Sequence, residues 1–123
     1  MKLESECDRL CSQIVQLRDK GKCRLCSAPG IEPHHICRKG GAVRWYLPNL
    51  IYVCRKCHDH DNEVIMSWKV MAAIGFDKYD ELVRMSHEVR QWKEFELREL
   101  KADFQEILNY YATMATEKSW SAT

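Results

Sequence analysis

Two Cys-x-x-Cys pairs are the clearest chemical feature of the sequence. Cys23 and Cys26 form the first pair, Cys54 and Cys57 form the second, and residues 27–53 separate them. The chain has seven cysteines, and an odd count with two such pairs indicates metal binding rather than a disulfide framework. Each pair can place two thiolates about 2.3 Å from one tetrahedral ion, so the spacing predicts a structural Zn²⁺. An ion with four cysteine ligands has no open coordination position, so this ion is not expected to be catalytic.

The second pair also matches a haem-attachment pattern. Cys54-Arg-Lys-Cys57-His58 has the Cys-x-x-Cys-His spacing of c-type haem sites. That reading would leave Cys23 and Cys26 without a role, and the attachment chemistry belongs outside the cytoplasm. The N-terminal segment MKLESECDRLCSQ is charged and lacks the apolar region of a signal peptide. We therefore favour zinc over haem.

Histidine and asparagine side chains lie between and beside the cysteine pairs, at His34, His35, Asn49 and His58. An imidazole titrates near neutral pH and can act as a general base. A divalent ion with nitrogen or oxygen ligands stabilises the negative charge of a phosphodiester transition state. Adjacent residues of a strand point to opposite faces, so we expect His34 and His35 to divide the roles of ligand and base. Residues i and i+4 share a helix face, which makes Asn62 a candidate ligand beside His58.

The segment that holds these residues resembles a nuclease family. The run CRLCSAPGIEPHHICRKGGAVRWYLPNLIYVCRKCHDHDN, residues 23–62, resembles the HNH nucleases that carry a four-cysteine zinc core. The matching order is a cysteine pair, His-His, Asn-Leu, and a cysteine pair followed by His. The resemblance implies a β-hairpin followed by a crossing helix, and hydrolysis of phosphodiester bonds in DNA. It also implies a catalytic Mg²⁺ or Mn²⁺, with Zn²⁺ or Ni²⁺ as alternatives.

The resemblance further implies a role for each motif residue. His35 would be the general base that activates water, and Asn49 would fix the loop around this base. His34 and His58 would bind the catalytic ion, with Asn62 as the additional candidate ligand.

Basic side chains surround the motif. Residues 18–58 contain nine Lys and Arg residues and two acidic residues. Residues 59–123 contain eight Lys and Arg residues and thirteen acidic residues. A basic centre predicts a polyanionic partner, although an unevenly charged, solvated surface would give the same count. The candidate contacts to DNA phosphates are Arg38, Lys39, Arg44, Arg55 and Lys56. Trp45 and Tyr46 either stack on bases or pack the hairpin.

The downstream half resembles a narrower group, the lambdoid phage NinG/Rap recombination nucleases. The residues that carry this resemblance are Ile74-Gly75, His87, Trp92 and the run from Lys101 to Gln105. It implies structure-specific cleavage of branched DNA, including Holliday junctions and D-loops. Because a resolvase cuts two strands, it also implies a homodimer. Two other functions stay open: a nicking or double-strand HNH nuclease of the restriction, packaging or homing type, and a non-catalytic zinc module that binds DNA.

Sequence periodicity predicts the elements that position these residues. Apolar residues at alternating three- and four-residue spacing predict helices, and short apolar runs between turn residues predict strands. The expected helices cover residues 3–18, 55–75, 77–86 and 88–115, and the expected strands are Ile31–Ile36 and Asn49–Val53. We therefore predict an α+β, mostly helical fold with a ββα-metal core. The single domain 1–123 divides into an N-terminal helix 1–20, a zinc-stabilised core 21–75, a helical part 76–116 and a tail 117–123.

The first and last predicted helices both carry narrow apolar seams. The seams either pack on each other within one chain or form a dimer interface. No stretch approaches the roughly 18 apolar residues of a membrane span. We therefore expect no membrane partner and a cytoplasmic location, which would be that of the bacterial host if a phage encodes the protein.

Overall fold

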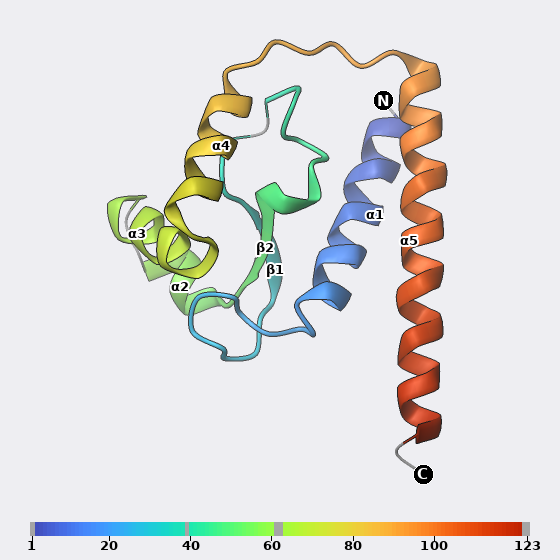
Figure 1. Ribbon diagram of the computed structural model, residues 1–123, viewed down its shortest axis with the longest axis horizontal. Helices are drawn as coiled ribbons and strands as arrows, with labels where there is room; N and C mark the ends of the chain where they lie inside the picture. Colours follow the sequence, from blue (N-terminus) through green and yellow to red (C-terminus); the bar gives the residue numbers. More distant parts are fainter. Residues whose placement is uncertain (1, 39, 61–62, 122–123) are drawn as a thin grey trace.

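The structure, a computed structural model, describes residues 2–38, 40–60 and 63–121. The chain is mostly helical with one small sheet, an α+β architecture (Figure 1). In chain order the elements are α1 (Lys2–Arg18), β1 (Glu32–His35), a 3-10 turn (Leu47–Asn49), β2 (Leu50–Val53), α2 (Arg55–His60), α3 (Glu63–Ile74), α4 (Phe76–Ser86) and α5 (Glu94–Ser121). The predicted first helix, the two strands and the helix over residues 77–86 are confirmed to within two residues at each end.

The two strands form an antiparallel hairpin that lies between two helical layers. Glu32 is opposite Val53, and His35 is opposite Leu50. Because side chains alternate across a sheet, the hairpin has two different faces. Ile51 and Val53 face a core shared with α3, whereas Leu50 packs against α1. All four residues of β2 are buried because helices cover both of its faces (Figure 1).

Helices α1 and α5 lie side by side and run in the same direction (Figure 1). Their apolar seams meet within one chain, which is one of the two arrangements that the sequence left open. The buried residues of this core are Cys7, Leu10, Cys11, Ile14, Trp45, Leu97 and Phe104. An ion pair of 2.8 Å between Lys101 and Glu6 borders the seam. Dimer formation stays a prediction.

The last helix begins later and ends later than the sequence predicted. The expectation was a helix over residues 88–115, but α5 runs from Glu94 to Ser121, so the expected tail is partly helical. The carboxylate of Glu96 accepts a hydrogen bond from the backbone N–H of Lys93 at 3.0 Å, which caps the helix at this point. Just before it, the indole N–H of Trp92 donates to the carbonyl of Gly41 at 2.7 Å. These contacts hold the preceding segment against the loop after β1, so it is not part of the helix.

The loop between the strands is packed rather than open. Trp45 is 5 % exposed and meets Trp92 edge to face, with 5.4 Å between the ring centroids. A Cβ at Gly41 would collide with the backbone carbonyl of Arg90, so only glycine fits there. Trp45 therefore packs the hairpin loop, one of its two predicted roles. Across the described residues, no helix has the length and apolar character needed to cross a membrane.

Candidate functional site

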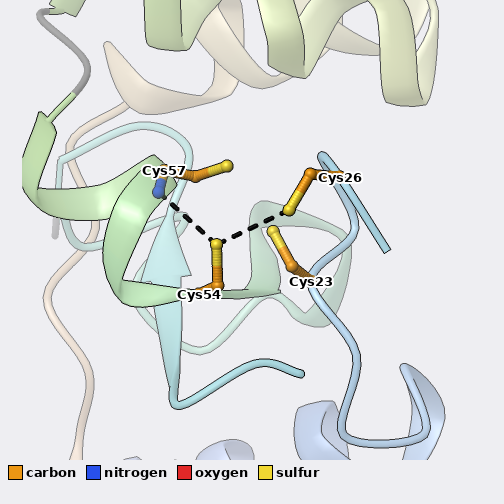
Figure 2. A group of neighbouring side chains, drawn as sticks. All are labelled: Cys23, Cys26, Cys54 and Cys57. Atoms are coloured by element: carbon orange, nitrogen blue, oxygen red, sulfur yellow. Dashed lines mark hydrogen bonds between the residues drawn. The ribbon is translucent and has the colours of Figure 1, made fainter. Parts of the chain in front are cut away.

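The four cysteines of the two pairs form one cluster. Their Sγ atoms all lie within 4.8 Å of one another (Figure 2). Ligands about 2.3 Å from a tetrahedral ion lie about 3.8 Å apart, so the cluster fits a Zn²⁺ of the kind the spacing predicted. Cys23 and Cys26 come from the turn after α1, whereas Cys54 and Cys57 lie at the end of β2 and in α2. A metal ion bound here would join the chain before the hairpin to the helix that follows it.

Local hydrogen bonds shape the first cysteine turn. The carbonyl of Cys23 accepts the N–H of Ser27 at 2.8 Å, and Ser27 has a positive φ of 66° that closes the turn. The N–H of Arg24 donates to the carbonyl of Tyr52 at 2.9 Å, which extends the edge of the hairpin. The turn is therefore fastened to β2, and β2 continues directly into the second cysteine pair.

Hydrogen bonding and burial shift the thiol pKa values of the cluster in opposite directions. The backbone N–H of Cys57 donates to the Sγ of Cys54 at 3.4 Å and lowers the pKa of Cys54 to about 7. Burial raises the pKa of Cys57 to about 12, because a buried thiolate without a cation is unfavourable. The ammonium of Lys69 on α3 lies 3.9 Å from the Sγ of Cys57. Lys69 was not predicted from the sequence, because its approach depends on how α3 packs.

His34 and His58 meet on the face of the hairpin that points toward α2 and α3. Their ring centroids are 5.5 Å apart and the rings are nearly perpendicular. Both rings border a cavity of about 350 Å³, whose other lining residues include Arg38, Met66 and Ser67. Burial lowers the pKa of His34, and charge on His58 lowers it further. A neutral imidazole that keeps a nitrogen lone pair is the form that binds a metal ion.

His35 points to the other side of the hairpin, toward α1, and reaches the edge of the same cavity. The ring Nε2 of His35 lies 3.1 Å from the backbone carbonyl oxygen of Arg44. A carbonyl only accepts hydrogen bonds, so this nitrogen carries the proton and Nδ1 carries the lone pair. In the neutral ring with this tautomer, Nδ1 is the atom that could take up a proton.

Asn49 is the last residue of the loop between the strands, directly before β2, and is completely buried. Its Oδ1 accepts the N–H of Cys37 at 2.9 Å, and its Nδ2 donates to the carbonyls of Cys37 and Val43, each at 3.2 Å. The side chain thus joins both ends of the loop that also contains Arg44. This is the kind of contact that the resemblance implies for the middle residue of the motif.

Arg44 is held by helix α1. Its guanidinium lies 2.8 Å and 3.2 Å from the two carboxylate oxygens of Asp8, and 3.4 Å from Glu4. The indole N–H of Trp45 donates to the same Asp8 carboxylate at 2.9 Å. Sequence patterns did not find Asp8, because helical spacing says nothing about a partner so distant in the chain. The predicted phosphate contact of Arg44 stays a prediction.

A second acidic residue that the sequence did not reveal fastens α1 to β2. Asp19 is nearly buried and accepts hydrogen bonds from Arg18, from Arg24 and from the backbone N–H of Tyr52. Burial raises the pKa of this carboxyl, but the hydrogen bonds outweigh burial and lower it below its usual value. Arg18 also donates to the carbonyls of Leu47 and Leu50.

Of the remaining predicted residues, only some can be placed. Arg38 lines it, and Arg55 and Lys56 are exposed on the first turn of α2. Lys39 and Asn62 lie outside the described residues.

Comparisons with known proteins give no relative. No protein-family model matches the chain. Neither a curated protein nor a solved structure matches it. The resemblance to HNH nucleases therefore depends on the motif residues.

Proposed function

We propose that this protein is a metal-dependent DNA endonuclease of the HNH type that cuts branched recombination intermediates. The observation that carries the proposal is the meeting of His34 and His58 at one cavity, with His35 at its edge. This arrangement lies beside a separate four-cysteine cluster, so a structural ion and a catalytic ion would occupy different sites.

The donor set at the cavity fits a catalytic ion. Two imidazoles are nitrogen ligands that leave further coordination positions for water and phosphate. Imidazole ligands favour Zn²⁺ or Ni²⁺, whereas Mg²⁺ and Mn²⁺ prefer oxygen ligands, which water and the DNA phosphate would supply at the remaining positions. When bound, the ion would supply charge stabilisation to the phosphate and to the leaving oxygen. Asn62, four residues after His58, stays a candidate ligand.

The proposed reaction is hydrolysis by an activated water. His35, with its Nε2 proton held by the Arg44 carbonyl, takes a proton from water at Nδ1. The resulting hydroxide forms a bond to phosphorus, and the bond from phosphorus to the 3′ oxygen breaks. The 3′ oxygen takes up a proton from a solvent water and His35 releases its proton to solvent, which leaves a 5′-phosphate and a 3′-hydroxyl. Asn49 contributes by fixing the loop that holds the carbonyl of Arg44.

The basic side chains near the cavity would hold the DNA backbone. Arg38, Arg55 and Lys56 are exposed, and contacts of this kind are independent of sequence and weaken as salt rises. Preference for branched DNA is proposed from the resemblance of the downstream half. Two cuts in one junction require two centres, which a homodimer would supply.

A cleavage panel tests the proposal. Zinc-loaded protein would be incubated with linear duplex, forked and four-way substrates in Mg²⁺, Mn²⁺, Ni²⁺ or added Zn²⁺. We expect faster cutting of forked and four-way DNA, with 5′-phosphate ends. Equal cutting of linear duplex would instead indicate a restriction, packaging or homing type of nuclease. If every substrate stays intact under every condition, the proposal of an enzyme is contradicted. The alternative of a non-catalytic zinc module that binds DNA would then be favoured.

A further inference from the structure

One acidic residue lies on the same face of the hairpin as His34 and contacts His58. Glu32 is the first residue of β1 and lies two residues before His34, so both side chains are on the same face of the strand. Across the hairpin Glu32 is opposite Val53, the last residue of β2. The chain continues from there into α2, which carries His58. The register therefore brings the Glu32 carboxylate beside the first turn of α2.

The contact between Glu32 and His58 is specific to one ring nitrogen. The Nδ1 of His58 lies 3.0 Å from the Oε1 of Glu32. An ionised carboxylate only accepts hydrogen bonds, so Nδ1 must carry the proton. In the neutral imidazole the lone pair is then on Nε2. A carboxylate that holds the distant nitrogen of a ligating histidine is a common way to orient such a ring.

We propose that Glu32 is a positioning residue that holds His58 in its Nδ1-protonated form and turns Nε2 toward the ion shared with His34. The inference rests on the proposed function, because it assumes that the cavity binds a divalent ion. Glu32 would affect metal binding by orienting the ring of His58, and would not itself bind the ion. His34 is half-buried, and its ring packs against the ring of His58.

The exposure of the pair makes the inference testable. The side chains of His58 and Glu32 are 38 % and 45 % exposed. An ion pair this exposed adds little to stability, so removing the Glu32 carboxylate should leave the fold intact. Glu99 on α5 is exposed and distant from the cavity in sequence and in fold, and it provides a matched control.

The first measurement concerns the proton on His58 in the zinc-loaded protein without added metal. Long-range ¹⁵N–¹H NMR spectra at pH 8 distinguish a protonated Nδ1 from a protonated Nε2. We expect His58 to be protonated on Nδ1 in the parent and in Glu99→Ala, and to shift toward the Nε2-protonated form in Glu32→Ala. An unchanged His58 spectrum in Glu32→Ala would overturn the inference.

The second measurement is the affinity for Mn²⁺ by titration calorimetry. We expect Glu32→Ala to bind Mn²⁺ about 10- to 100-fold more weakly than the parent, and Glu99→Ala to bind it equally well. In a His58→Ala background, Glu32→Ala should cause no further loss, because a positioning residue acts only through the ring it positions. A further loss in that background would show a direct ligand and overturn the positioning role.

The outcomes also separate this inference from the proposed function. A parent protein that binds no Mn²⁺, Ni²⁺ or Zn²⁺ beyond the cysteine cluster would contradict both. A parent that binds Mn²⁺, with an equal affinity in Glu32→Ala, would contradict only the role of Glu32. Melting temperatures of all variants should agree within a few degrees, which excludes unfolding as the cause of any loss.

Discussion

The carboxylate of Asp8 holds the guanidinium of Arg44 through two hydrogen bonds, 2.8 Å and 3.2 Å long. The backbone carbonyl of Arg44 in turn lies 3.1 Å from the ring of His35. Helix α1 is outside the motif that resembles HNH nucleases, yet these contacts connect it to the candidate base. The N-terminal helix is therefore part of the structure that positions His35.

Replacing Asp8 should reduce cleavage more than it reduces stability. In Asp8→Asn the guanidinium of Arg44 loses its charged partner, and the loop that holds His35 becomes less well fixed. We expect the single-turnover rate to fall by about 10-fold or more, because small misplacements of a catalytic group are costly. Glu4→Gln should have a smaller effect, since its contact with Arg44 is longer, at 3.4 Å. A cleavage rate in Asp8→Asn equal to that of the parent would show that the contact between Asp8 and Arg44 does not influence His35.

Asn49→Ala should destabilise the protein. The substitution leaves the buried N–H of Cys37 and the carbonyls of Cys37 and Val43 without this partner. Unsatisfied buried groups cost roughly 1–3 kcal/mol, so we expect about 3 kcal/mol less free energy of unfolding in urea titrations. Asn109→Ala, at an exposed position of α5, is the control and should change stability by less than about 0.5 kcal/mol. A loss no larger than that of the control would contradict the bridging role of Asn49.

Metal removal should unfold the hairpin and α2. The four cysteines lie together between these elements, and a structural zinc bound by them would contribute its binding free energy directly to folding. We expect a single Zn²⁺ per chain by elemental analysis, and a large loss of helical circular dichroism after strong chelators. Cys54→Ser should reproduce this loss, whereas Cys37→Ser, outside the cluster, should retain zinc. A chain that keeps its melting temperature after complete zinc removal would refute a structural role for the ion.

Local features of the fold were predictable because local patterns decide them. The cysteine spacing predicted the cluster, and apolar periodicity predicted α1 and the two strands. The start of α5 was predicted wrongly, since residues 88–93 are held by Gly41 and by the Glu96 cap rather than by their own propensity. Periodicity shows which residues form a face, but not which distant side chain that face will meet.

The candidate site was predictable only in part for the same reason. The His34, His35, Asn49 and His58 positions follow from the motif. Asp8, Glu32 and Lys69 do not, because each reaches its partner through packing between elements. No short-range pattern distinguishes these three from the other charged residues of the chain.

Acid should weaken the contribution of Asp19 to stability. The pKa of this carboxyl is lowered in the folded protein relative to about 3.9 in an unfolded chain. Its contribution is therefore complete above the unfolded pKa and is lost as pH falls through the lower, folded pKa. We expect Asp19→Asn to lower the free energy of unfolding by about 2 kcal/mol at pH 7. This loss is smaller than that from breaking a fully buried ion pair, because the side chain of Arg18 is one-quarter exposed.

Denaturation of both proteins at several pH values checks this expectation. The difference between parent and Asp19→Asn should shrink once the pH falls below about 4. The comparison uses only pH values at which both proteins retain the same zinc content, because zinc loss would itself unfold the hairpin that Asp19 contacts. A stability difference between the two proteins that grows toward low pH would contradict the lowered pKa of Asp19.

The most direct test of the central claim is the single-turnover rate of His35→Ala on the DNA substrate that the parent cuts fastest. The loss of a general base typically costs 10²-fold or more, so we expect a decrease of about that size. The variant should keep its zinc and melt close to the parent, because the ring of His35 is not among the buried core residues. A folded, zinc-loaded His35→Ala protein that cuts DNA at the parent rate would contradict the proposed nuclease centre.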